Sequence, residues 1–268
     1  MALKRDAAKA QRPFATRWML PMFRFLLIVA ISLGMLGCSN TIRGAKTFAP
    51  TWFGFVEISK NIYVDEGMSL PQRIEVLKTV GAAQERVSQF FGKLYGHPRI
   101  FACSTEKCFG ANGHGATPKG QAYGSSTLML SPRGLNVVII SLELTHIELH
   151  TRIGTFRSWR AIPNWFDEGL TVLVSQDPRY TKEAWLKATG HGQNAPALTV
   201  LSWGKGSWIL AYGTARHAVG YWYSHADHSG LMRLIAEVKQ GEDFDMAVNN
   251  MPSENASNPA LHISHSHE

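Results

Sequence analysis

Two histidines and two adjacent carboxylates are the residues of this chain whose types and spacing could do chemistry. His146 and His150 lie four positions apart, so a helix through them places both imidazoles on one face. Asp167 and Glu168 follow in a second segment with helical spacing. Two imidazoles and one carboxylate from a second helix make a zinc site with an open fourth position, so we predict that His146, His150 and Glu168 bind Zn2+. Asp167 could orient a ligand histidine through its far ring nitrogen, or simply cap its own helix.

Hydrolysis at such a site also needs a carboxylate that takes a proton from the zinc-bound water. Glu148 is poorly placed for this role, because two positions on from His146 is about 200° round a helix, close to the opposite face. Glu143 lies three positions before His146, on the histidine face but one turn along the axis. We therefore predict that Glu143 is the general base. Its structural alternative is a salt bridge with Arg152 or Arg133.

The segments around these residues predict the elements that position them. Residues 136–152 have the pattern of one helix, which Asn136 can cap and Gly154 can end. Residues 161–175, entered through Pro163, are predicted to form the second helix. Further helices are predicted over 71–94, 182–189, 208–224 and 231–239, one or two strands over 53–64, strands over 99–102 and 121–130, and a glycine-rich loop over 104–120. Strands and a long helix first, followed by helices, indicate an α+β fold.

The first 37 residues have the pattern of a signal peptide. A basic stretch precedes an apolar run over 25–36, which is too short to span a bilayer comfortably. The run leads into Met35-Leu36-Gly37-Cys38-Ser39, which resembles the lipobox of bacterial lipoproteins, with methionine where leucine is more usual. We expect cleavage before Cys38 and a lipid on its thiol, or alternatively an uncleaved N-terminal anchor. Within the lipoprotein pattern, Ser39 favours the periplasmic side of the outer membrane.

Charge and cysteine usage agree with a location in the cell envelope. Residues 1–37 hold six of the 27 lysines and arginines and one of the 20 acidic residues, which leaves 21 basic and 19 acidic residues and a net charge of +2. The remainder has no basic stripe interleaved with aromatic residues, which argues against nucleic-acid binding. Cys103 and Cys108 can form a small disulfide in an oxidising compartment, or can stay reduced.

Composition divides the chain into four parts. These are a signal peptide over 1–37, a linker over 38–50, one domain over 51–250 and a polar tail over 251–268. The tail contains three histidines that could bind a metal weakly, but its polarity predicts a disordered, solvated segment.

The histidine motif and the Asp-Glu-Gly at 167–169 together resemble the zincin metallopeptidases whose third zinc ligand is a glutamate, the gluzincin or peptidase MA-like type. In that family a helix carries HExxH, a glycine follows the second histidine by four residues, and a second helix carries the glutamate within (Asn/Asp)-Glu-Gly. His146, His150, Gly154 and Glu168 match these positions, and the resemblance covers roughly 55–250. It implies a zincin-like domain: a small mixed sheet with an active-site helix, followed by a helical C-terminal part.

The catalytic glutamate is where this chain departs from the family, because Ile147 follows the first histidine. In another register, the stretch 142–146 (Leu-Glu-Leu-Thr-His) is similar to HExxH with its first histidine replaced by leucine, and His150 then stands in as a ligand. Both registers make Glu143 the better base. By analogy with a tyrosine of related enzymes, Tyr212 is the candidate to stabilise the oxyanion, with Arg216 and His217 as alternatives.

These observations lead to three functional hypotheses. The first is a zinc-dependent hydrolase that cleaves peptide or amide bonds of a peptide or protein substrate and is anchored in the envelope membrane by a lipid on Cys38. The second is a catalytically inactive zincin-like lipoprotein that acts as a binding module. The third is a structural lipoprotein without a metal.

Overall fold

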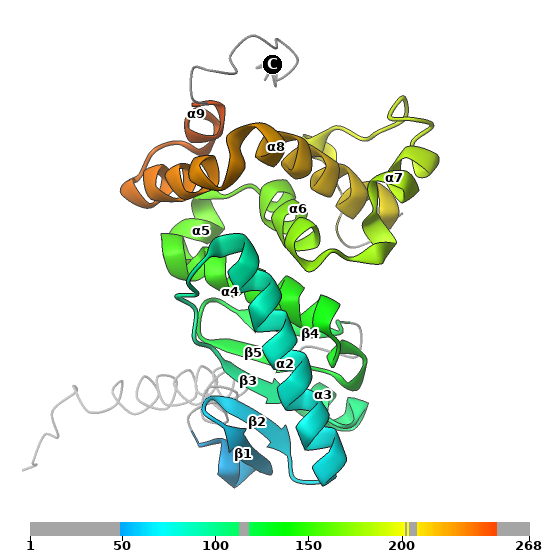
Figure 1. Cartoon of the computed structure of the whole chain (residues 1–268), viewed down its shortest axis with the longest axis vertical. Helices are drawn as coiled ribbons and strands as arrows, with labels where there is room; N and C mark the ends of the chain where they lie inside the picture. Colours follow the sequence, from blue (N-terminus) through cyan, green and yellow to red (C-terminus); the bar gives the residue numbers. More distant parts are fainter. Residues whose placement is uncertain (1–48, 113–117, 202, 204–207, 251–268) are drawn as a thin grey trace, which may run out of the picture. The chain divides into compact units, whose positions relative to one another are not determined.

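The computed structural model describes residues 49–112, 118–201, 203 and 208–250. The described residues from Pro50 onward belong to one compact unit. They form a mixed sheet and a set of helices, with helices alone after the last strand, which confirms the predicted α+β class (Figure 1). The predicted signal peptide, most of the linker over 38–50 and the tail over 251–268 lie outside the described residues. Among the described helices, none is long and apolar enough to cross a bilayer.

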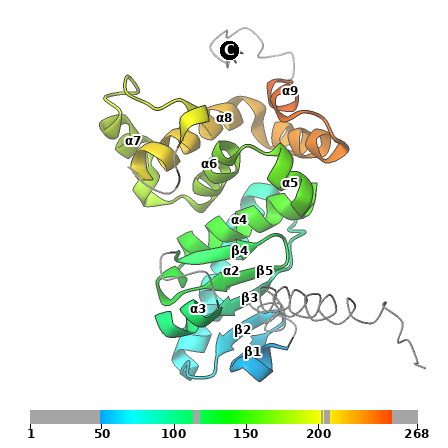
Figure 2. The same cartoon turned by 180° about the vertical axis from the view of Figure 1, so that it is seen from behind.

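Five short strands make the sheet, in the order β1-β2-β3-β5-β4. The strands are β1 (Phe55–Ser59), β2 (Ile62–Asp65), β3 (Arg99–Ala102), β4 (Gly120–Tyr123) and β5 (Thr127–Leu130). The inner pairs β2–β3 and β3–β5 are parallel, and the outer strands β1 and β4 run antiparallel to their neighbours. Strand β4 is therefore an edge strand, and helix α4 (Val137–Ile153) lies beside it (Figure 2).

The two faces of the sheet bury different side chains, because successive residues of a strand point to opposite faces. One face contributes to the main core, together with apolar residues of the helices, through Ile62, Val64, Ile100, Ala102, Leu128 and Leu130. The other face forms a smaller cluster in which Phe101 stacks on Tyr63, with ring centroids 5.1 Å apart. Phe109 of the short helix α3 (Glu106–Asn112) is fully buried in that cluster.

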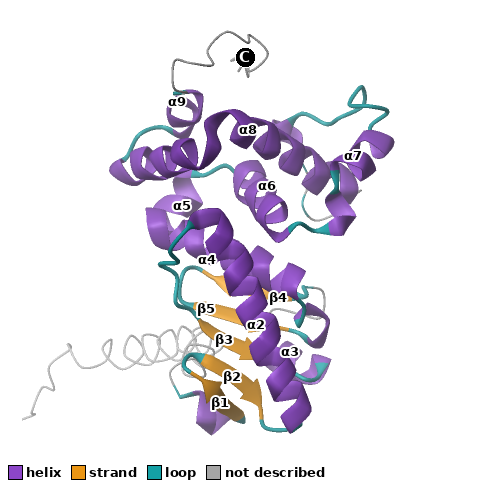
Figure 3. Ribbon diagram, viewed as in Figure 1, coloured by secondary structure: helices purple, strands orange, loops and turns teal. Residues whose placement is uncertain are grey.

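Helices and the loops between them form the remainder of the described unit (Figure 3). They are α2 (Leu70–Phe91), α3, α4, α5 (Thr155–Ala161), α6 (Asn164–Ser175), α7 (Lys182–Ala188), α8 (Trp208–Gln240) and α9 (Phe244–Asn249). Short 3-10 turns lie at Pro50–Phe53, Pro132–Gly134, Pro178–Tyr180 and Leu198–Val200. Helix α4 packs on α2 and on α6, and α6 packs on α8, so α4 and α6 lie side by side in the interior.

Most predicted elements are confirmed, and three differ in an informative way. The segment predicted as one strand over 121–130 is a hairpin, because Gly124 with φ of 58° allows a tight turn between β4 and β5. The predicted loop over 104–120 contains α3, which the confirmed Cys103–Cys108 disulfide ties to the end of β3. The two predicted C-terminal helices are joined in α8, which is interrupted at Asp227, where φ is 55°.

Candidate metal centre

Helix α4 forms where the sequence predicts it, because both of its ends are fixed. The Asn136 side-chain oxygen accepts a hydrogen bond from Ile139 N at 3.0 Å, which caps the start of the helix. Gly154 adopts φ of 102° and donates its N–H to His150 O at 2.9 Å, which ends it. Ile147 is 1% exposed in the core, so it contributes no group to the face that carries the histidines.

Helix α6 is held against α4 and α8 by its own glycine and aromatic residues. A Cβ at Gly169 would lie only 2.5 Å from Ala215 O of α8, so glycine is what allows the two helices to approach. Phe166 is fully buried between Trp222 and Phe244, with ring centroids 5.4 and 5.1 Å away. This packing fixes the helix on which Asp167 and Glu168 lie.

Side chains of α4 and α6 converge as the sequence predicts. His146 Nε2 lies 3.7 Å from Glu168 Oε2, and His150 Nε2 lies 3.4 Å from Asp167 Oδ2. Two ligand atoms bound to one tetrahedral zinc ion are about 3.4 Å apart, so the atoms of each pair are spaced as two ligands of one ion are. Three possible ligand atoms, one from each of His146, His150 and Asp167, all lie within 4.8 Å of one another. These three residues could therefore hold a metal ion, with Glu168 beside them.

Asp167 makes a second contact that bears on the two predicted roles for this residue. Its Oδ1 lies 2.8 Å from His146 Nδ1, which is hydrogen-bond distance. An imidazole that donates from Nδ1 to a carboxylate leaves Nε2 as the metal-binding nitrogen, so this bond would set the tautomer that a ligand histidine needs. Asp167 thus both orients His146 and lies beside His150. The spacing of the residues predicted that Asp167 could orient a histidine, but it predicted Glu168 alone as the carboxylate ligand.

The charges of this group are strongly coupled. Burial alone would lower the pKa of His146, but the nearby carboxylates of Asp167, Glu168 and Glu143 raise it to about 10. Burial alone would raise the pKa of Asp167, but its contacts with His146 and His150 hold it well below its ordinary value. Burial raises the pKa of Glu168. Without a metal, a proton on His146 supplies the positive charge that these buried carboxylates require.

Glu143 lies close to this group and is 9% exposed. Its Oε2 accepts a hydrogen bond from Ala122 N of β4 at 2.8 Å. Burial raises its pKa to about 7, which the positive charge of His146 and the bond from Ala122 oppose. A carboxylate with this pKa can exchange a proton near neutral pH, as a general base must. The two arginines considered as structural partners bind elsewhere, since Arg152 pairs with Glu148 and Arg133 pairs with Glu106.

An open cleft of about 480 Å³ borders Glu143. It is lined by Pro118, Lys119, Gly120, Ile139, Leu142, Glu143, Arg179, Tyr180, Trp208 and Tyr212. Tyr212, predicted as the oxyanion donor, lies in this wall. Burial and the charges of Glu168 and Glu143 raise its pKa, so its hydroxyl keeps its proton and can donate a hydrogen bond. Its alternative His217 stacks on Trp185, with ring centroids 3.9 Å apart, which is a packing role.

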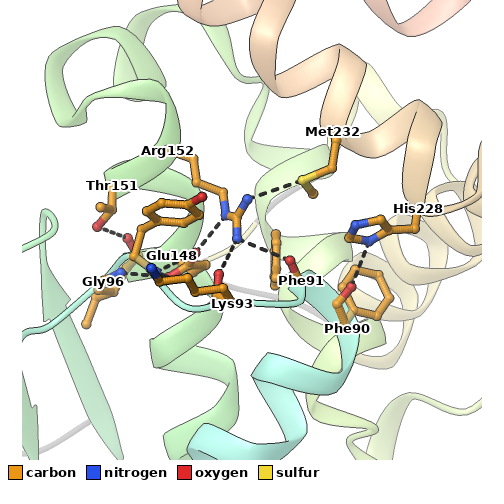
Figure 4. A network of polar contacts seen from close by, with 11 residues as sticks. Phe90, Phe91, Lys93, Gly96, Glu148, Thr151, Arg152, His228 and Met232 are labelled. Atoms are coloured by element: carbon orange, nitrogen blue, oxygen red, sulfur yellow. Dashed lines mark hydrogen bonds and ion pairs between the residues drawn. The ribbon is translucent and has the colours of Figure 1, made fainter.

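Glu148 belongs to a different network of polar contacts, with Arg152 and the segment that follows α2 (Figure 4). It is 2% exposed and accepts hydrogen bonds from Tyr95 N, Gly96 N and Arg152 Nε. Arg152 in turn donates to Phe91 O and Lys93 O at the end of α2. These contacts make Glu148 a structural residue, as its helical position predicts.

Sequence reasoning did not identify Arg179, Tyr180 and Trp208 as part of the site. Arg179 and Tyr180 follow α6 in the 3-10 turn Pro178–Tyr180, and Trp208 begins α8. No spacing rule links these positions to α4, although a cluster of aromatic residues near Tyr212 was visible in the sequence.

Comparisons of the chain with protein-family models, with curated proteins and with solved structures find no match.

Proposed function

We propose that this protein is a zinc-dependent hydrolase of peptide or amide bonds, anchored in the bacterial cell envelope. One observation carries the proposal: His146, His150 and Asp167, from adjacent helices, converge within reach of one ion, with Glu168 3.7 Å from His146 and a buried Glu143 that faces a cleft. In this proposal His146, His150 and a carboxylate of the Asp167–Glu168 pair hold zinc.

The donor set suits zinc by its chemistry, since imidazole nitrogens with a carboxylate and an open position are typical of catalytic zinc sites. Bound zinc would supply a water of lowered pKa and a Lewis acid for the scissile carbonyl. Residues of the chain would supply the proton transfer and the stabilisation of the oxyanion. Glu143 accepts a proton and returns it to the leaving amine, and the Tyr212 hydroxyl donates to the developing oxyanion.

The proposed location rests on the N-terminal pattern, with its basic stretch, its short apolar run and Cys38. The Cys103–Cys108 disulfide is consistent with an oxidising compartment.

A second function is favoured by a specific observation, the buried Ile147 in place of a carboxylate next to His146. If Glu143, one turn away and bonded to Ala122, cannot reach the bound water, the protein is a metal-binding module that recognises an envelope partner without turnover. Glu143→Gln separates the two functions, since glutamine keeps the acceptor for Ala122 N but cannot take a proton. The hydrolase predicts bound zinc and a loss of turnover in this variant. Turnover equal to wild type would remove Glu143 as the base, and zinc without turnover in the wild type would favour the binding module.

A further inference from the structure

The cleft beside Glu143 has two kinds of lining that together describe a ligand. Leu142, Ile139, Trp208 and Tyr212 present apolar and aromatic surface, and Trp208 is 48% exposed. Tyr212 stacks on Trp208 and on Tyr180, with ring centroids 5.6 and 5.1 Å apart. A ligand group that packs against these residues is therefore apolar, and an aromatic ring fits this surface best.

Two cations line the same cleft, Lys119 and Arg179. The guanidinium of Arg179 is held in a fixed plane, because its Nε donates to Asp177 Oδ1 at 2.9 Å and its Nη2 also donates to Asp177. The Tyr180 ring supports it from one side, with the guanidinium carbon 5.0 Å from the ring centroid. Asp177 is itself 1% exposed and so is anchored in the protein. Such a guanidinium is ordered before a ligand binds, which reduces the entropy cost of binding.

Arg179 also lies near the residues proposed to act on the substrate. The cleft is lined by Arg179 together with Glu143 and Tyr212. A group bound by Arg179 therefore occupies the cleft that Glu143 and Tyr212 also line.

We propose that Arg179 recognises a carboxylate of the substrate, and that a neighbouring apolar or aromatic side chain of the same peptide fills the cleft against Leu142, Trp208 and Tyr212. Lys119 contributes a second positive charge at the cleft. The carboxylate is either an acidic side chain or the C-terminus of the peptide. This inference rests on the proposed function for its choice of a peptide, but it concerns binding and is tested without turnover.

The test measures the affinity of the full chain for matched short peptides, by calorimetry and by the fluorescence change of the tryptophans, with zinc chelated so that no hydrolysis occurs. One acetylated and amidated pair contains Phe-Asp or Phe-Asn. A second pair ends in Phe-Ala with a free or an amidated C-terminus. We expect about tenfold tighter binding of one charged member over its neutral twin, which is the range of a charge-assisted hydrogen bond. The pair that shows the preference identifies the source of the carboxylate.

Arg179→Gln is expected to abolish the preference and to leave the affinity for the neutral twin within about twofold. Because this change leaves Asp177 buried without its partner, Asp177→Asn/Arg179→Gln is measured beside it, and exposed Arg160→Gln on α5 is the matched control. A wild-type protein that binds charged and neutral peptides equally, or a preference that persists in both Arg179 variants, would overturn the inference. Hydrolysis by a protein that does not prefer the charged peptides would support the proposed function and overturn this inference. A preference for a charged peptide without hydrolysis would support this inference and overturn the proposed function.

Discussion

Replacing Glu148 should lower the free energy of unfolding of the protein without changing its zinc content or its turnover. The carboxylate accepts from Arg152 Nε at 2.6 Å, from Gly96 N at 2.8 Å and from Tyr95 N at 3.0 Å. Glu148→Ala leaves a guanidinium that is 11% exposed without its counter-charge, and two backbone N–H groups without an acceptor. Breaking a buried ion pair in this way costs about 3 to 5 kcal/mol. For a domain of this size, each kcal/mol lowers Tm by about 2 to 4 °C, so we expect a fall of roughly 10 °C.

The assay is urea denaturation together with zinc content and turnover per folded molecule. The double variant Glu148→Leu/Arg152→Met should recover part of the lost stability, because it removes both charges. Exposed Glu85→Ala on α2 is the control and should change the free energy of unfolding by less than about 0.5 kcal/mol. A Glu148→Ala protein of nearly wild-type stability that has lost turnover would refute the reasoning, since Glu148 would then act in catalysis.

Three further predictions follow from the charges of the site. Burial raises the pKa of Glu143 to about 7 in the metal-free protein, and burial persists when zinc is bound. We therefore expect kcat/KM to increase with pH as Glu143 loses its proton and then to level off, and Glu143→Gln to lower kcat/KM by about 10²- to 10⁴-fold with zinc retained; a profile that is flat from pH 5 to 9 would contradict this. Since the pKa of His146 is about 10 in the metal-free protein, zinc binding at pH 7 should release about one proton from His146, which calorimetry in buffers of different ionisation enthalpy measures; binding without proton release would be the contrary result. In the metal-free protein, the stabilisation that comes from the raised pKa of His146 is complete below about pH 6.5 and is lost as pH rises through 10, whereas the stabilisation from the lowered pKa of Asp167 is present above about pH 4. Asp167→Asn should therefore reduce the free energy of unfolding, measured by urea denaturation, most strongly between about pH 4 and 6.5. A reduction that does not change with pH would contradict the proposed interaction of His146 with Asp167.

The sequence was most informative where local rules decide the structure. Asn136 and Gly154 mark the ends of α4 through capping rules that involve only neighbouring residues, and the four-residue spacing of His146 and His150 follows from the helix alone. The same geometry removed Glu148 from the candidate bases, which agrees with its burial beside Arg152.

Contacts between distant segments could not be predicted from these local rules. Arg179 and Trp208 join the cleft only because α6 and α8 pack together, and Gly169 shows its role only when Ala215 lies against it. Whether Asp167 or Glu168 completes the metal group likewise depends on how α6 is rotated against α4, which a difference of one residue in the sequence does not determine. Helix α3 was not predicted, because the segment around it is rich in glycine. Burial of Phe109 and the Cys103–Cys108 disulfide stabilise this helix.

Zinc content is the most direct test of the account. Elemental analysis is made on the full chain after mild purification, beside His146→Ala and a control in which the three tail histidines at 262, 265 and 267 are replaced by alanine. We expect one zinc ion per chain in the wild type and in the tail control, and its loss in His146→Ala. A wild-type protein that contains no metal, and whose Tm does not change when zinc is added, would contradict it.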